Sequence, residues 1–369
     1  MLLSKTIGKI IGKQLIIEKG EKMDKKKILW FLVFVLLVGL TLYTLITTSK
    51  TFSFDGFVTY MKQANPFWIV CAVICMLLYI LFEGISIKCL TGFLGTKTSV
   101  RKGFIYSAAD IFFSAITPSA TGGQPASAFF MMTDGIPASV TAMSLILNIA
   151  LYTVSIIIIG LVSVIFFPGV YKNFDILSRV LVILGFVIQI VCVASFLIVV
   201  YKDKVLFKIL DKLIGVAKKL HLTKSASKKR KKLEKIATEY KECSSAVANR
   251  FGIIVKILIY NILQRLSQIG VTACVFLAVG GNVAAIPRVF ATQGCVILGS
   301  NAVPVPGAVG VADYLFLEGF RGVVPESDII NIELLSRGIS FYGCIILCII
   351  IVAVCYLIDK KRIRKAKEG

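Results

Sequence analysis

Charged and amide side chains inside otherwise apolar stretches are the residues that could do chemistry in this sequence. Such groups are costly at membrane depth, so they mark binding sites or ion pathways there. The candidates of this kind are Glu83, Asp110, Asn261, Gln264, Arg265, Gln268, Asp313 and Glu318. Lys256 also lies in an apolar run, but near its end, where a lysine can extend its ammonium group into water.

Four of these candidates are spaced three or four residues apart, which places them on one face of a helix. They are Asn261, Gln264, Arg265 and Gln268. A polar stripe of this kind should face a cavity. Arg265 is the strongest candidate for a permanent positive charge deep in the protein, and its planar fork suits a phosphate group. The alternative is a structural ion pair between Arg265 and a buried acid such as Glu83 or Asp313, and both interpretations remain open.

Two segments rich in proline and glycine interrupt apolar stretches, one in each half of the chain. They are TPSATGGQP at 117–125 and VPVPGAVGVAD at 303–313. Paired breaks of this kind are typical of transport sites at the bilayer midplane. Non-helical backbone is tolerated at that depth only where protein or a water-filled cavity satisfies it. We therefore expect a site between the two segments.

The glycines of these segments precede predicted helices that begin near Ala126 and Val311. Backbone N–H groups at such turns can bind an anion without a charged side chain. Alternatively, the glycines only permit tight turns and close helix packing. Together with Arg265, the predicted headgroup-binding residues are Thr117, Pro118, Gly122, Gly123, Gln124, Pro304, Pro306, Gly307, Gly310 and Asp313, supported by the other intramembrane polar residues named above.

The elements that position these residues must be membrane helices, because 57% of the 369 residues are hydrophobic and several apolar runs reach about 20 residues. The predicted fold is an all-α polytopic membrane protein with about six full spans. The spans are 28–48, 67–90, 138–167, 180–201, 251–280 and 338–358.

Basic residues predict the orientation of these spans, because they concentrate on the cytoplasmic side. Residues 1–27, 88–103, 202–250 and 359–369 carry 8, 4, 15 and 6 Lys/Arg, whereas the loops of the opposite side carry seven altogether. Both termini are therefore expected in the cytoplasm. With that assignment, 104–131 and 287–320 must enter and leave on one side each, which predicts two oppositely oriented re-entrant hairpins resembling an inverted repeat. The alternative is that each hairpin is one kinked span, which the charges disfavour.

These assignments divide the chain into five segments. They are a cytoplasmic basic segment 1–27, a first membrane half 28–201, a basic amphipathic cytoplasmic loop 202–250, a second membrane half 251–358 and a cytoplasmic basic tail 359–369. The basic loop suits the anionic lipids of the inner leaflet.

Several function classes are disfavoured. The net charge of +22 lies in segments that flank spans, without a nucleic-acid-binding motif, so we expect no direct nucleic-acid partner. The ten cysteines form no C-x-x-C pair, and His221 is the only histidine, so we predict neither a metal site nor a cofactor. No P-loop, G-x-S-x-G or G-x-G-x-x-G motif indicates an enzyme.

At its two proline-glycine segments the chain resembles the membrane-domain family of bacterial lysylphosphatidylglycerol synthases, the flippase-like part of the multiple peptide resistance factor. The family pattern pairs T-P-x-x-x-G-G-[EQ] with a later P-x-P-G-[GA]-x-G-x-x-[ED], here Thr117 to Gln124 and Pro304 to Asp313. The resemblance covers about residues 23–360. Where many members have Glu and then Arg in the first loop, this chain has Gln124 and Ser127.

The resemblance implies a translocase that moves lysylphosphatidylglycerol, or a related phospholipid or lipid-linked headgroup, between leaflets of the bacterial cell membrane. One alternative is lysyl transfer from lysyl-tRNA to phosphatidylglycerol, by the chain alone or with a separate synthase, contributing to resistance to cationic peptides. A second alternative is a scaffold that does not transport. Since the family's soluble aminoacyl-transfer domain does not occur in these 369 residues, we expect no transferase activity from the chain alone.

Overall fold

The computed structural model describes residues 54–117, 122–201, 236, 238–247, 250–301, 303, 308 and 310–354. The predicted first span 28–48, the two basic terminal segments and most of the basic loop 202–250 lie outside these residues. Within them the protein is helical, and its only extended feature is an isolated bridge between Arg321 and Val324. The all-α prediction is confirmed for this part of the chain.

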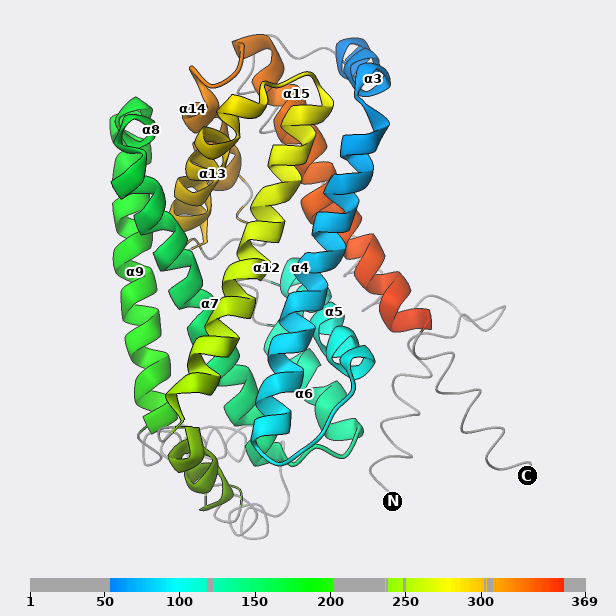
Figure 1. The fold of residues 1–369 in the computed structure, drawn as a ribbon, viewed down its shortest axis with the longest axis vertical. Coiled ribbons are helices and arrows are strands. Elements are labelled where there is room, and N and C mark those ends of the chain that lie inside the picture. Colours follow the sequence, from blue (N-terminus) through cyan, green and yellow to red (C-terminus); the bar gives the residue numbers. More distant parts are fainter. Residues whose placement is uncertain are drawn as a thin grey trace, which may run out of the picture.

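Long apolar helices form the body of the molecule (Figure 1). They are α4 (Pro66–Phe93), α7 (Ala138–Phe166), α9 (Ile176–Tyr201), α12 (Phe251–Ala278) and the helix that begins with α15 (Glu326–Arg337) and runs on to residue 354. The short α3 (Phe54–Gln63), α8 (Pro168–Asn173) and η2 (Val283–Ala285) lie beside them. Asn65 begins α4 by accepting a hydrogen bond from the Phe67 N–H, and Pro66 occupies the first helical position, where no amide hydrogen is needed.

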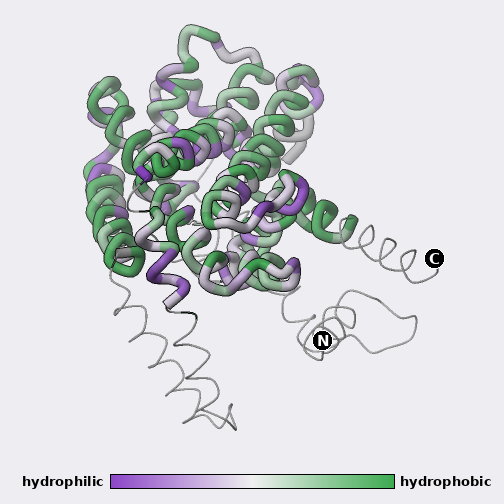
Figure 2. Tube along the Cα trace, turned by 60° about the horizontal axis from the view of Figure 1, so that its bottom comes forward, coloured by the Kyte–Doolittle hydropathy of each residue, from purple (hydrophilic) through white to green (hydrophobic). Residues whose placement is uncertain are grey.

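Five of the described helices are long and apolar enough to cross a membrane, or six if α12 and the short helix Thr238–Val247 before it form one bent span. Hydrophobic residues cover most of the length of the long helices (Figure 2). The predicted spans 67–90, 138–167, 180–201 and 251–280 each correspond to one helix to within a few residues. The chain is therefore a multi-pass membrane protein.

The predicted span 338–358 begins too late. The helix starts at Glu326 and continues from α15 through a π-helical stretch, η4 (Gly338–Gly343), to residue 354. Its first twelve residues mix charged side chains with isoleucine and leucine, so their hydropathy does not indicate a membrane span. The tertiary fold makes them helical because their polar side chains are buried against neighbouring helices.

Each proline-glycine segment connects two helices that fold back on each other. α5 (Val100–Ile116) and α6 (Gly123–Thr133) correspond to the predicted hairpin 104–131, and α13 (Ile286–Ser300) and α14 (Val311–Phe320) to 287–320. The two pairs lie toward opposite ends of the molecule (Figure 1). Residues 283–300 are themselves long and apolar enough to cross a membrane, whereas α5 and α6 do not qualify by these criteria.

Glycines bring the first pair close to the rest of the fold. A Cβ built on Gly103 of α5 would lie 2.2 Å from the carbonyl oxygen of Gly84 on α4, so the two backbones touch. A Cβ on Gly123 of α6 would lie 2.0 Å from a carboxyl oxygen of Asp110 on α5. These contacts fix α5 against α4 and α6 against α5, next to the acids of the candidate site.

Candidate functional site

A cavity of about 610 Å³ lies between the two interrupted segments. Ser114 and Gln124 line it from beside the first break, and Asn301 and Ala308 line it from beside the second. The long helices α4, α7, α9, α12 and the helix from α15 onward complete the wall. Two segments almost 200 residues apart in the sequence therefore contribute to one polar chamber in the interior of a membrane protein.

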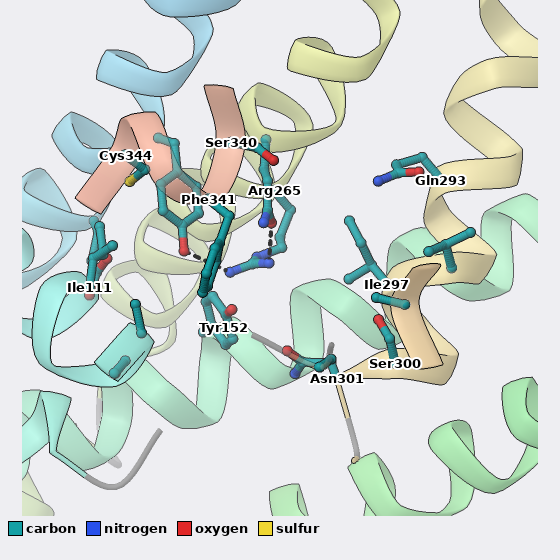
Figure 3. A pocket seen from close by; sticks show the side chains of 18 of the residues that line it. Ile111, Tyr152, Arg265, Gln293, Ile297, Ser300, Asn301, Ser340, Phe341 and Cys344 are labelled. Atoms are coloured by element: carbon teal, nitrogen blue, oxygen red, sulfur yellow. Dashed lines mark hydrogen bonds between the residues drawn. The ribbon is translucent and has the colours of Figure 1, made fainter. Parts of the chain in front are cut away.

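Arg265 lies at the centre of this chamber, with only 2% of its surface exposed (Figure 3). Its guanidinium carbon lies 3.9 Å from the centre of the Tyr152 ring, and one Nη donates a hydrogen bond of 3.2 Å to the Tyr79 hydroxyl. The other Nη donates to Gln268, one turn along α12. The Nε–H has no hydrogen-bond partner among the described residues.

No carboxylate in the described part of the chain forms an ion pair with Arg265. Asp313, one of its two expected partners, instead pairs with Arg337 of α15. Glu83, the other, accepts hydrogen bonds from Ser107 at 3.1 Å and from Gln264 at 3.0 Å. Arg265 therefore forms no salt bridge with either acid among the described residues. Its hydrogen bonds and ring contacts are to neutral groups, and Glu83 acts on it only through a longer-range electrostatic interaction.

Arg337 is a second buried arginine of the same cavity, which the sequence analysis missed. Its surface is 7% exposed, and Glu333, 4% exposed, lies 3.7 Å from its guanidinium. Both residues line the cavity. Arg265 is thus not alone in carrying positive charge into the interior, but Arg337 already has two carboxylates beside it.

Glu83 and Asp110 form a carboxyl pair at another part of the wall. They are 6% and 5% exposed, and their carboxyl groups lie within hydrogen-bonding distance of each other. Asp110 accepts hydrogen bonds from Ser114 of α5 and from Gln124 of α6 at 2.6 Å. The predicted site residues Asp110 and Gln124 are therefore in direct contact across the hairpin.

One glycine amide beside each break, that of Gly122 and that of Gly310, is engaged by the chain itself. The Gly122 N–H donates to the Thr117 hydroxyl at 2.8 Å, and the Gly310 N–H donates to the Asp313 carboxylate at 2.8 Å. Gly310 has φ +86°, a conformation that favours glycine. These contacts fit the turn-forming role of the two glycines better than an anion site at their amides.

The structure distributes the predicted residues unevenly. Glu83, Asp110, Gln124, Arg265 and Gln268 line the cavity, whereas Glu318 pairs with Arg321, which is exposed. Asn261 and Gln264 are fully buried and do not line the cavity, so only Arg265 and Gln268 of the predicted stripe face it. Pro118, Pro304, Pro306 and Gly307 lie outside the described residues. Lining residues that the sequence did not indicate include Tyr79, Asn148, Tyr152, Gln189, Gln293, Glu333 and Arg337.

Comparison with known proteins agrees with this architecture. The family model described as lysylphosphatidylglycerol synthase TM region matches residues 28–348. No curated protein matches the chain. No solved structure matches it either. Because the matched region includes both interrupted segments and every described helix up to the π-helical stretch, the chain belongs to the family of lysylphosphatidylglycerol synthase transmembrane regions.

Proposed function

We propose that this protein translocates a phosphate-bearing lipid, lysylphosphatidylglycerol or a related phospholipid or lipid-linked headgroup, between the leaflets of the bacterial cell membrane. The observation that carries the proposal is Arg265, a buried guanidinium without a carboxylate partner among the described residues, in a cavity between two broken segments. Removing an unpaired charge from water is expensive unless a ligand neutralises it. A lipid phosphate supplies the missing negative charge.

The cavity has the dimensions and polarity that a headgroup requires. About 610 Å³ falls within the range of small-molecule sites, and the acyl chains can remain in the bilayer while the headgroup occupies it. One wall carries the charged groups. The opposite wall, from α9 and α13, presents the neutral amides of Gln189 and Gln293, each with one atom that lacks a hydrogen-bond partner among the described residues. Such a lining lowers the cost of moving a polar group past hydrocarbon.

The two helix pairs are proposed to be re-entrant hairpins of opposite orientation that act as gates on either side of the cavity. Their positions toward opposite ends of the molecule and their breaks beside the cavity support this arrangement. Both termini are then cytoplasmic, and an aminoacyl-lipid synthase is the expected source of the substrate.

Cysteine labelling tests that topology. In a cysteine-free background, Thr133→Cys at the base of the first pair and Ala284→Cys at the base of the second are exposed positions. An impermeant maleimide added to intact cells should label Ala284→Cys, whereas Thr133→Cys should react only after the membrane is opened. Labelling of both from the same side contradicts the opposed hairpins.

Transport in liposomes tests the function. Purified protein is reconstituted with fluorescent analogues of phosphatidylglycerol, lysylphosphatidylglycerol and phosphatidylethanolamine, and an external reductant then quenches the outer-leaflet dye. Protein-containing vesicles should lose more fluorescence than protein-free vesicles for at least one phosphate-bearing headgroup, and the comparison identifies which one. Equal loss for all headgroups with and without protein contradicts the proposal.

A further inference from the structure

The carboxyl pair Glu83–Asp110 forms no salt bridge among the described residues, although Arg265 faces Glu83. Neither acid forms an ion pair with a lysine, arginine or histidine among the described residues, and their hydrogen-bond donors are the neutral groups of Ser107, Gln264, Ser114 and Gln124. Two carboxylates in contact within a membrane protein cannot both carry an uncompensated charge. Something positive must therefore bind between them.

Two buried amide oxygens on α12 lack hydrogen-bond donors among the described residues, and one of them belongs to Gln264, which contacts Glu83. Gln264 donates its amide to Glu83, but its Oε1 is fully buried and accepts no hydrogen bond from the described residues. Asn261, one turn earlier on α12, has an equally buried Oδ1 without a donor, and its Nδ2 contacts Ser86 and Asn148. Buried polar atoms that lack partners call for an absent ligand. Because both atoms are acceptors, that ligand is a cation or a proton donor.

The chemistry of the oxygens restricts the cation. Carboxylate, amide and hydroxyl oxygens suit hard cations. The described residues contain no group of three or more His, Cys, Asp or Glu side chains able to hold a metal ion, which disfavours a divalent ion. The other titratable groups that face the pair are Tyr79 of α4, Arg265 of α12 and Cys344 of the last helix. Arg265 can balance one of the two carboxylate charges, so one further positive charge is needed to balance the other.

We propose that Glu83 and Asp110, with the amide oxygens behind them, bind one small monovalent cation, H⁺ or Na⁺, whose movement is coupled to that of the lipid. This inference rests on the proposed translocase function and adds its energy source. Glu83 belongs to α4 and Asp110 to the first helix pair, so the bound cation joins the scaffold to a gate. Loss of the cation leaves two carboxylates that repel each other and loosens that gate.

The close contact between Gly84 and Gly103 links the state of the carboxyl pair to the packing of α5 on α4. Their backbones touch one residue after Glu83 on α4 and seven residues before Asp110 on α5. A contact that close allows no intervening side chain to absorb a change in separation. The carboxyl pair therefore senses whether α5 is seated on α4, and Gln124 transmits the same contact to α6 at 2.6 Å.

Infrared difference spectroscopy of the purified full-length chain tests the cation site without any transport. Between acidic and alkaline pH, the wild type should show a buried carboxyl C=O band that titrates, and adding Na⁺ instead of choline should shift that band if Na⁺ is the ion. Glu83→Gln and Asp110→Asn should each abolish the signal, whereas Glu242→Gln, an exposed carboxyl on the helix before α12, should leave it intact. A wild type without a titrating or Na⁺-sensitive carboxyl band overturns the inference, as does a band that both site variants retain.

Gradients imposed across liposomes test the coupling. A pH gradient or a Na⁺ gradient should drive lipid to one leaflet in the wild type, and an ionophore for that ion should abolish the bias. Glu83→Gln should lose the ion-driven bias, whereas Glu242→Gln should keep it, and circular dichroism melting confirms that both variants are folded. The outcomes are separable from those of the proposed function. Lipid movement that ignores both gradients overturns the coupling and leaves the translocase intact, whereas a cation-sensitive carboxyl band without lipid movement supports the site and contradicts the translocase.

Discussion

The guanidinium of Arg265 lies over the ring of Tyr152, with 3.9 Å between the guanidinium carbon and the ring centre. Tyr152 belongs to α7 and Arg265 to α12, so the contact joins two long helices at the cavity. The ring occupies one face of the guanidinium and leaves its edge, where the N–H groups are, for hydrogen bonds. The unpartnered Nε–H lies on that edge, which is the geometry that phosphate recognition uses.

Tyr152 should matter through its ring and not through its hydroxyl. We expect Tyr152→Phe to transport nearly as well as the wild type. Tyr152→Leu should lose a buried cation–π contact worth about 2 kcal/mol. This corresponds to a roughly 30-fold smaller equilibrium constant for the correctly oriented arginine. Transport rates of the two variants in liposomes make the comparison. Equal activity of the leucine variant and the wild type would remove the ring from the mechanism.

The Asp313–Arg337 pair should be a structural requirement of the second helix pair. Its carboxylate also accepts the Gly310 N–H at the start of α14. Removing the arginine leaves two buried carboxylates uncompensated, and removing the Asp313 charge leaves the arginine with Glu333 alone, at 3.7 Å. Asp313→Asn and Arg337→Gln should each cost about 3–5 kcal/mol of stability. Because the two sites interact, the double variant should cost clearly less than the sum, measured by thermal melting in detergent. Strict additivity would contradict a direct pair.

Close packing of α5 on α4 predicts that Gly103 tolerates no side chain. Gly103→Ala must push its methyl group into the Gly84 carbonyl, so we expect a loss of about 1–3 kcal/mol and weaker transport. Gly252→Ala is the matched control, because a Cβ at this position of α12 meets nothing within 4 Å. It should be neutral or slightly stabilising. Similar melting temperatures for the two alanine variants would show that the backbones do not touch.

Asp175, before α9 and outside the spans, should make the second helix pair sensitive to acid. Hydrogen bonds with Ser178, the largest cause, and then from Tyr314 and the Leu177 N–H lower the pKa of Asp175 from 3.8 to about 2. A lowered pKa means that the stabilisation is complete above the unfolded pKa near 4 and is lost as the pH falls toward 2. The effect should be small because solvent reaches the carboxylate. Melting of the wild type and of Asp175→Asn should differ at pH 6 and converge near pH 2; a constant difference would contradict this role.

Much of the fold follows from apolar length, because a membrane helix must satisfy its own backbone and few alternatives exist. α4, α7, α9 and α12 are therefore visible in the sequence, and Arg265 stands out against its apolar neighbours. The start of α15 is different. Glu333 and Arg337 resemble a polar loop until Asp313, more than twenty residues earlier, is known to face them.

The sequence also could not predict which side chains contact each other across the cavity. Spacing places Asn261, Gln264 and Arg265 on one face of α12, but it cannot say which acid each one meets. In the structure Gln264 donates a hydrogen bond to Glu83, whereas Arg265 lies over the Tyr152 ring and donates a hydrogen bond to Tyr79. Aromatic partners carry no signal in an apolar span, because most tyrosines there only fill space.

Substitution of Arg265 tests the central claim most directly. Lys256→Gln is the matched control, since it removes a positive charge from an exposed position of the same helix. In liposomes, with folding checked by thermal melting, Arg265→Gln should abolish transport of the phosphate-bearing lipid, Arg265→Lys should retain only part of it because the planar fork is lost, and Lys256→Gln should transport like the wild type. A folded Arg265→Gln variant that moves the lipid at the wild-type rate would contradict the assignment of this arginine as the phosphate ligand.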